Sequence, residues 1–234
     1  MKLFIIDTET TGLTEDDQIC EIAGTQYEIG MDYKGAIASI STLMPVLSND
    51  AEFINGIAPE LTRVHEGFSV EYGNHKLSVS LFKAMAIASD YCVAFKAEFD
   101  APLINALIGK QKWLCAMQDF EWGYPRVNAY GGYKLIDLAL WMGIGISTAH
   151  RAGDDVRLLV ECMNRRQNLW DMIERAILRS NSPIIQLQAL VSYEDRQLAK
   201  DAGFSWDGSK KVWVKSIKQC DYIEFSELKT KIIS

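Results

Sequence analysis

Long apolar runs, paired cysteines and positive charge are all scarce in this chain of 234 residues. No stretch approaches the roughly 18 to 20 consecutive apolar residues that a membrane-spanning helix needs, so we expect no membrane segment. The N-terminal stretch MKLFIIDTET reaches acidic side chains before it could form the apolar core of a signal peptide. The sequence therefore predicts a cytoplasmic protein.

The cysteines are five in number, widely spaced and without a C-x-x-C pair. This pattern argues against both a disulfide framework and a zinc site. We expect them to be reduced and mostly buried.

Positive charge is in deficit, because 24 lysines and arginines face 31 aspartates and glutamates, for a formal net charge of −7. Bulk electrostatic attraction to nucleic acid is therefore not expected, and such binding would need a local basic patch or bound cations. The acidity lies in residues 1–182, since residues 183–234 carry eight basic and seven acidic side chains.

The length fits one domain of catalytic size with a small appendage, and the 48% hydrophobic content fits a globular core. Helical periodicity stops at Ser182 and Pro183, and a new apolar strand begins there. We predict a first domain over residues 1–182 and a small α+β accessory domain over 183–234. The second domain would serve substrate or partner binding.

Apolar patterning predicts a mixed α/β organisation. Three strands joined by short polar turns, over 2–7, 18–29 and 35–44, predict an antiparallel meander. Gly56 and Pro59 predict a break between two short helices. The elements expected after them are a helix over 78–90, a strand over 91–95, a helix over 101–110, a strand over 113–117, a helix over 133–144 and a long helical region from 152. The last fifty residues predict a strand, a helix, a hairpin and a final helix.

An acidic pair follows the first strand in FIIDTETTGL. Because side chains alternate along a strand, Asp7 and Glu9 point to one face and Thr8 to the other. Two close carboxylates are best compensated by a divalent cation with oxygen ligands, Mg²⁺ or Mn²⁺. The competing interpretation is that these acids only begin a solvated loop, and this fragment alone does not decide between the two.

Further acids occur at the ends of later elements. Asp100 follows the strand YCVAF, where a first-turn helix acid is equally reasonable. In AHRAGDDVRLL, Asp155 shares a helical face with Leu159, so it is expected to point inward, and His150 lies in the approach to the same helix. Four inward acids and one histidine are what two-metal phosphoryl chemistry needs, with the histidine removing a proton from water.

Three motifs in order now resemble a known family, the DEDDh 3′-5′ exonucleases of the RNase H-like superfamily, which includes the proofreading ε subunit, RNase T and exonuclease X. FIIDTETTGL is similar to the first motif, AFKAEFDAPLI to the second and HRAGDDVRLL to the third. The resemblance covers about residues 1–168. It implies an RNase H-like mixed sheet with flanking helices.

The resemblance also implies roles for individual residues. Asp7, Glu9, Asp100 and Asp155 would ligate two divalent metal ions, and His150 would be the general base. The terminal nucleotide would lie against the backbone of Thr10, Thr11, Gly12 and Leu13, with Leu13 as an apolar wedge. Asn55 would line the other side of that pocket.

The second motif departs from many relatives, because Phe95 and Lys96 stand where a His-Asn pair is common. The carboxylate of Asp100 is retained, so the departure concerns contacts with the 3′ nucleotide. We expect Lys96 to contact a substrate phosphate. A solvated lysine that pairs with Glu98 is the alternative.

Taken together, the sequence predicts a two-metal 3′-5′ exodeoxyribonuclease that releases nucleoside 5′-monophosphates and prefers single-stranded 3′ ends. An exoribonuclease of the same family is the nearest alternative, because both substrates end in the same phosphodiester. A non-catalytic end-binding module is the second. The sequence does not indicate a protein partner.

Aromatic residues lie beside lysines in GFSWDGSKKVWVK, within the accessory domain. Trp206 and Trp213 could stack bases while Lys210 and Lys211 hold phosphates. We favour the simpler interpretation that both tryptophans and Phe204 form the core of this small domain.

Overall fold

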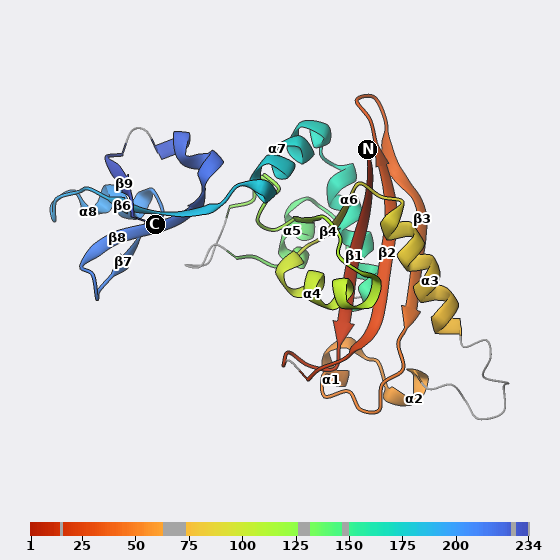
Figure 1. Cartoon of the computed structure of the whole chain (residues 1–234). Helices are drawn as coiled ribbons and strands as arrows, with labels where there is room; N and C mark the ends of the chain where they lie inside the picture. The colour runs from red at the N-terminus through yellow and green to blue at the C-terminus, as the bar shows by residue number, and fades with distance from the viewer. Residues whose placement is uncertain (15, 63–73, 126–131, 147–149, 226–227, 234) are drawn as a thin grey trace. The chain divides into compact units, whose positions relative to one another are not determined.

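The computed structural model of the chain describes residues 1–14, 16–62, 74–125, 132–146, 150–225 and 228–233. The chain divides into two compact units, residues 1–176 (unit 1) and 177–234 (unit 2), each with its own sheet (Figure 1). The division falls within helix α7 (Leu169–Asn181), six residues before the predicted boundary at 182. Each unit therefore has its own core.

Unit 1 is built on a five-stranded sheet in the order β3-β2-β1-β4-β5. Its strands are β1 (Lys2–Thr10), β2 (Ile19–Ile29), β3 (Lys34–Leu43), β4 (Tyr91–Ala94) and β5 (Trp113–Cys115). The first three pair antiparallel, whereas β4 runs parallel to β1 and β5 parallel to β4. The predicted mixed sheet with an antiparallel meander is confirmed, and this is the RNase H-like arrangement.

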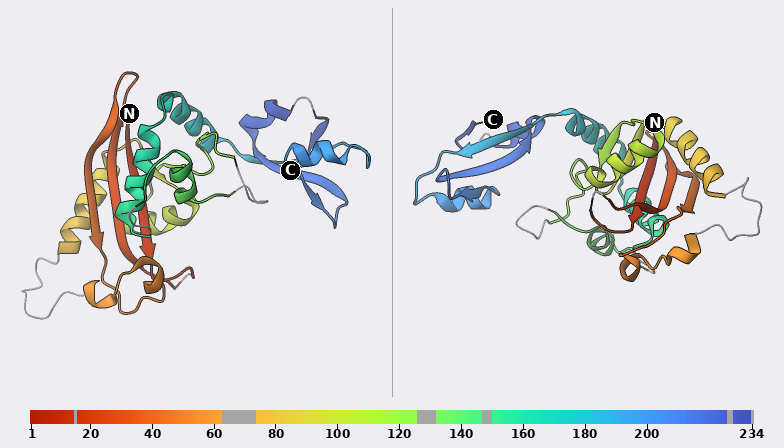
Figure 2. Two further views of the ribbon diagram at one scale, coloured as in Figure 1. Left: turned by 180° about the vertical axis from the view of Figure 1, so that it is seen from behind. Right: turned by 60° about the horizontal axis from the view of Figure 1, so that its bottom comes forward.

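Helices cover both faces of this sheet (Figures 1 and 2). They are α3 (Asn74–Ile87), α4 (Ala97–Ile108), α5 (Leu135–Trp141) and α6 (Ala152–Asn164). Such two-sided cover requires strands that are apolar on both faces, as β1 is. None of the described helices is both long and apolar enough to cross a membrane.

The central strand β1 shows how the sequence directs this layering. Residues 3–6 are at most 1% exposed, because both faces of the strand are covered. Phe4 and Ile6 pack in one cluster with Phe82 of α3 and Ile104 of α4. The odd-numbered side chains point to the opposite face, toward α6. Asp7 and Glu9 therefore continue the face toward α6, and Thr8 continues the face toward α4.

Two one-turn helices, α1 (Glu52–Asn55) and α2 (Pro59–Thr62), follow β3. The first ends at Gly56, whose φ of 67° is the left-handed conformation that glycine adopts without a steric cost. The break at Gly56 and the helix start at Pro59 agree with the sequence prediction.

Unit 2 is a small α+β unit with a four-stranded antiparallel sheet in the order β7-β8-β6-β9. Its strands are β6 (Ile184–Ala189), β7 (Ser205–Asp207), β8 (Val212–Lys218) and β9 (Thr230–Ile232). The short helix α8 (Arg196–Asp201) contributes Ala199 to the core that Leu187, Phe204 and Ile217 help to form. Half-buried Trp213 packs against this core, but Trp206 is 52% exposed, so the predicted core role of Trp206 is wrong.

Two helical predictions need correction. The long helical region from 152 is two helices, α6 and α7, separated at residues 165–168. The break is held by tertiary contacts, since the Arg166 guanidinium donates to the Trp122 carbonyl at 3.1 Å and Lys34 donates to the Arg166 carbonyl. The expected final helix is a 3₁₀ helix, η2 (Gln219–Phe225), followed by β9, which the sequence pattern did not predict.

Candidate functional site

Three carboxylates converge where the end of β1 faces the first turn of α6. Asp7, Glu9 and Asp155 each offer an oxygen atom, and these atoms all lie within 4.8 Å of one another. Asp7 and Glu9 come from the same side of β1, and Asp155 comes from the first turn of α6. Three negative charges this close repel one another unless protons or cations neutralise them.

Burial and mutual repulsion raise the pKa of all three acids. Burial is the main cause for Asp7, and the charges of Asp100 and Asp155 add to it, so the pKa of Asp7 lies well above its usual value. Burial, together with the charge of Asp155, raises the pKa of Glu9 to about 7. Burial raises the pKa of Asp155 to about 6, although the nearby His150 lowers it. The folded protein therefore favours neutralisation of this cluster at neutral pH.

Asp100 stands beside this cluster rather than within it. It lies in the first turn of α4, is 3% exposed, and accepts a hydrogen bond from the Thr8 hydroxyl at 2.8 Å. Burial raises the pKa of Asp100 to about 7, and the hydrogen bond from Thr8 opposes that rise. Its charge also raises the pKa of Asp7, so the fourth acid lies near Asp7.

The donor set fits a hard divalent cation. All of its ligand atoms are carboxylate oxygens, which Mg²⁺ and Mn²⁺ prefer. Oδ1 of Asp155 is buried and has no hydrogen-bond partner among the described residues. A buried, unpaired carboxylate oxygen is costly, so an ion here would satisfy an atom that the protein leaves unsatisfied.

His150 lies two residues before Ala152, the first residue of α6, and is exposed. Its φ of 61° is the left-handed conformation, which is uncommon for a residue other than glycine. It lies close enough to Asp155 to lower the pKa of that carboxyl. An exposed imidazole is thus held beside the carboxylate cluster.

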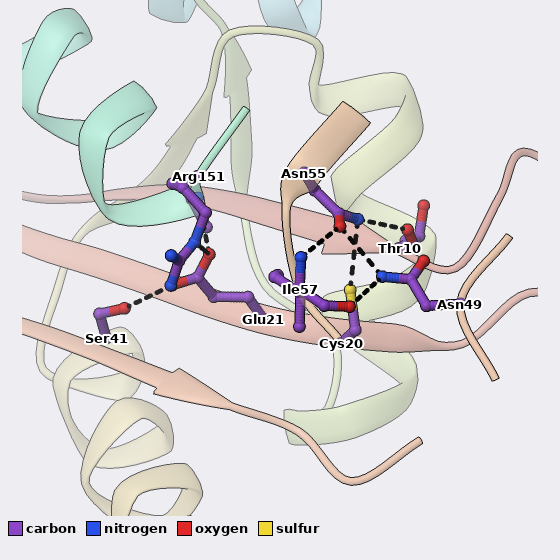
Figure 3. A network of polar contacts seen from close by, with 9 residues as sticks. Thr10, Cys20, Glu21, Ser41, Asn49, Asn55, Ile57 and Arg151 are labelled. Atoms are coloured by element: carbon purple, nitrogen blue, oxygen red, sulfur yellow. Dashed lines mark hydrogen bonds and ion pairs between the residues drawn. The ribbon is translucent and has the colours of Figure 1, made fainter. Parts of the chain in front are cut away.

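An ion pair that the sequence analysis missed fixes the start of α6 (Figure 3). Glu21 of β2 is 3% exposed and accepts two hydrogen bonds from the Arg151 guanidinium, at 2.9 and 3.0 Å. It also accepts from the Ala152 backbone N–H at 3.1 Å and from the Ser41 hydroxyl at 3.2 Å. Glu21 stands opposite Glu9 in the β1–β2 pairing, so this clamp connects α6 to the strand beside the cluster.

Asn55 of α1, which is 3% exposed, holds the segment predicted to receive the terminal nucleotide (Figure 3). Its Nδ2 donates to the Thr10 carbonyl at 3.2 Å. Its Oδ1 accepts from Nδ2 of Asn49 and from the Ile57 backbone N–H, both at 3.0 Å. The Asn55 amide therefore faces into the protein and ties α1 to the end of β1.

Asp17 organises the turn that contains Thr11, Gly12 and Thr14. Asp17 accepts hydrogen bonds from the Thr11 hydroxyl at 2.9 Å and from the Thr14 hydroxyl at 2.7 Å. Its carboxylate occupies the space beside Gly12, where a Cβ atom would lie only 2.6 Å from both oxygens. Leu13, in contrast, is 88% exposed. The turn thus presents one apolar side chain to solvent while its polar groups are satisfied internally.

Lys96 is exposed just before α4. Within the part of the chain that the structure describes, it forms no ion pair with Glu98, so the alternative raised from the sequence finds no support. Phe95 is buried and packs edge-on against Tyr133, with ring centres 5.6 Å apart.

The chain resembles known proteins in both sequence and fold. Residues 185–230 match a family model described as "Domain of unknown function (DUF8626)". Among solved structures, a full-length 3′-exonuclease has a TM-score of 0.51 at 14% identity, covering 70% of this chain and 59% of that protein. Cell-death related nuclease 4 (CRN-4) has a TM-score of 0.48 at 16% identity, covering 94% of this chain and 82% of the other. At 14% identity, the match to the full-length 3′-exonuclease shows a similar fold and nothing more.

The sequence relationship is stronger. The DNA polymerase III subunit epsilon of Treponema pallidum (strain Nichols) is 33% identical over 171 residues, which cover 66% of this chain and 71% of the relative. The chain therefore belongs to the DnaQ-like family and is a 3′-5′ exonuclease.

Proposed function

We propose that this enzyme is a 3′-5′ exodeoxyribonuclease that removes nucleoside 5′-monophosphates from single-stranded DNA ends. The observation that supports it most is the convergence of Asp7, Glu9 and Asp155, with oxygens within 4.8 Å of one another, beside His150. The choice of DNA over RNA rests on the ε subunit of the DNA polymerase to which the chain is related.

Family membership implies divalent metal dependence, and the four acids provide ligands of the right chemistry. Asp7, Glu9, Asp100 and Asp155 would hold two Mg²⁺ or Mn²⁺ ions. When bound, such ions stabilise the negative charge that develops on the phosphate and leaving oxygens. The raised pKa values of these acids then fall, because cations replace protons as the neutralising charge.

His150 acts as the general base in this proposal. The unprotonated nitrogen of a neutral imidazole can accept a proton from the attacking water and release it to solvent afterwards. Its exposure leaves Nδ1 and Nε2 accessible to water. Asp155 lies close enough to stabilise the imidazolium that forms.

The turn after β1 seats the 3′-terminal nucleotide. Leu13, whose side chain is exposed, would pack on the last base, and the backbone of Thr10, Thr11 and Gly12 would line the approach. Asn55 positions this turn through the Thr10 carbonyl rather than by touching the substrate. Exposed Lys96, at the start of the helix that carries Asp100, contacts a phosphate of the bound strand.

The test compares single-stranded DNA and RNA of one sequence, each labelled at its 5′ end, with Mn²⁺ or with EDTA. We expect DNA to shorten from its 3′ end with release of 5′-mononucleotides, and no shortening in EDTA. His150→Ala should lower kcat by about 10²- to 10⁴-fold. The control is the surface variant Arg157→Met in α6, which should keep the wild-type rate.

The alternatives predict different results. Faster shortening of RNA than of DNA would make the protein an exoribonuclease. Binding of 3′ ends without mononucleotide release, and without any effect of His150→Ala, would make it an end-binding module.

A further inference from the structure

Unit 2 contains a surface groove of about 550 Å³ that the exonuclease chemistry does not use. The face of α8 forms one wall and the β7–β8 hairpin forms the other. The chemistry-bearing side chains that line it are Tyr193, Arg196, Lys200, Trp206, Lys211 and Trp213. All of them lie within unit 2 and within the segment that matches the family model of unknown function.

Aromatic rings in this groove are left open to solvent. Tyr193 is 80% exposed and Trp206 is 52% exposed, although a unit this small needs large side chains in its core. The Trp206 and Trp213 rings lie side by side across the hairpin, with centres 5.5 Å apart and planes at 58°. Rings exposed in this way offer flat apolar surfaces for a ligand.

Cations accompany these rings. The Arg196 guanidinium lies 4.1 Å from the centre of the Tyr193 ring and donates to the Tyr193 carbonyl at 2.7 Å, so both groups are held in place. The Lys200 amine lies 5.9 Å from the centre of the Trp213 ring. The rings and the charges therefore form one surface.

The charged side chains that line the groove are all positive. Its lining includes Arg196, Lys200 and Lys211 but no carboxylate, and none of these three forms an ion pair among the described residues. By contrast, the neighbouring Lys210 lies outside the lining and is 4.0 Å from the Asp207 carboxylate. Over the whole unit, residues 177–234 carry nine basic and seven acidic side chains in a chain whose net charge is −7.

We propose that this groove binds single-stranded nucleic acid. Bases stack on Tyr193 and Trp206, and Arg196, Lys200 and Lys211 hold the phosphates. Exposed rings next to unpaired cations suit a single strand, because its bases are open to stacking and every base offers a flat face. A duplex hides those faces. The proposal adds a second binding site to the exonuclease and does not depend on how the first unit works.

The test uses the full-length protein and a fluorescent circular single-stranded oligonucleotide, in EDTA. The circle has no 3′ end, so it cannot occupy an exonuclease site, and fluorescence anisotropy measures its affinity. We expect Tyr193→Leu and Trp206→Leu each to weaken binding about ten-fold, in line with the loss of one stacked base. Tyr222→Leu, which removes a partly exposed ring of the same unit outside the groove, should leave the affinity unchanged.

Adjacent lysines provide the matched charge control. Lys211→Gln should weaken binding and reduce the slope of log affinity against log salt by about 0.7, the value for one phosphate contact with a single strand. Lys210→Gln, one residue away, should change neither quantity. Circular dichroism of each variant verifies that the unit is folded.

Failure to bind the circle by the folded wild-type protein, or equal loss in groove and control variants, overturns the proposal. Binding of a peptide in place of the circle does so as well. The two proposals can fail separately. A protein that binds the circle but hydrolyses no DNA would support the groove proposal and contradict the exodeoxyribonuclease proposal. A protein that hydrolyses DNA but does not bind the circle would do the opposite.

Discussion

At the scale of single residues, the least expected feature is the buried glutamate opposite Glu9. Glu21 lies in an apolar strand, and its charge is compensated by Arg151, by the Ala152 N–H and by the Ser41 hydroxyl. Arg151 brings a positive charge to a site rich in acids, and its pair with Glu21 fixes the start of α6. We infer that it holds α6 so that Asp155 meets Asp7 and Glu9.

The first prediction concerns this clamp. Arg151→Met leaves the Glu21 carboxylate buried without its main partner, which should lower the free energy of unfolding by about 1–3 kcal/mol. The half-exposed position of the arginine places the cost below that of a fully buried pair. Urea unfolding measures it. Exonuclease turnover should fall as well, because Asp155 loses its fixed position.

The control for the clamp is Arg157→Met on the same helix. Arg157 is half-exposed and lies 3.8 Å from Asp154 in a surface pair, so its loss should change the free energy of unfolding by less than about 0.5 kcal/mol. Adding Glu21→Gln to Arg151→Met should restore part of the stability. Equal effects of the two arginine variants would contradict the positioning role.

The second prediction follows from the raised pKa of Asp155. Burial raises this pKa to about 6 in the folded protein, from about 3.9 in an unfolded chain. A raised pKa means that folding favours the protonated form, so stability is fully present at low pH and is lost as pH rises through 6. In EDTA, Asp155→Asn should therefore be as stable as wild type near pH 4 and more stable, by about 2 kcal/mol, at pH 8.

Urea unfolding of both proteins at several pH values checks this expectation. Asp154→Asn is the control, because the Asp154 carboxylate is next to Asp155 in the sequence but half-buried and outside the cluster. A stability difference that is constant from pH 4 to pH 8 would mean that Asp155 does not titrate with a raised pKa.

At the scale of elements, much of the fold could be predicted because strand and helix periods are local. The meander, the break at Gly56 and the helix that begins with the third motif all follow from such patterns. The four acids and His150 could be listed from motifs, but Thr8, Glu21 and Arg151 could not. Their roles depend on tertiary contacts, of Thr8 with Asp100 of α4 and of Glu21 with Arg151 before α6, and sequence spacing does not fix such contacts.

The third prediction tests the link between β1 and α4. The Thr8 hydroxyl donates to Asp100, and that hydrogen bond opposes the rise in the pKa of Asp100. Thr8→Val should lower the free energy of unfolding by about 1–2 kcal/mol. It should also move the acid limb of the pH–rate profile to higher pH, because Asp100 then loses its proton less readily.

Thr25→Val is the matched control for this link. Thr25 is buried in β2 and its hydroxyl shares a hydrogen bond with Ser39 at 2.8 Å, away from the carboxylates. It should cost similar stability without a shift of the pH–rate profile. If both variants shift the profile equally, the effect comes from the sheet rather than from Asp100.

At the scale of the whole molecule, charge is divided between the units. The proposed metal ligands all lie in the acidic unit 1, whereas unit 2 has a slight excess of basic residues. The acidic unit 1 needs bound cations before it can bind a nucleic acid strand, whereas the basic groove of unit 2 does not. The two units are thus suited to hold nucleic acid by different means, one dependent on metal ions and the other dependent on salt.

The fourth prediction uses that difference in a thermal experiment on the full-length protein. A ligand that binds only the folded form stabilises it by about 2.7 kcal/mol at a concentration 100-fold above its Kd. Mn²⁺ should therefore raise the unfolding temperature of unit 1 while leaving that of unit 2 unchanged. Differential scanning calorimetry with Mn²⁺ and with EDTA measures both, and Asp7→Asn should abolish the shift. A single transition that Mn²⁺ moves as a whole would instead show that the two units unfold as one cooperative structure.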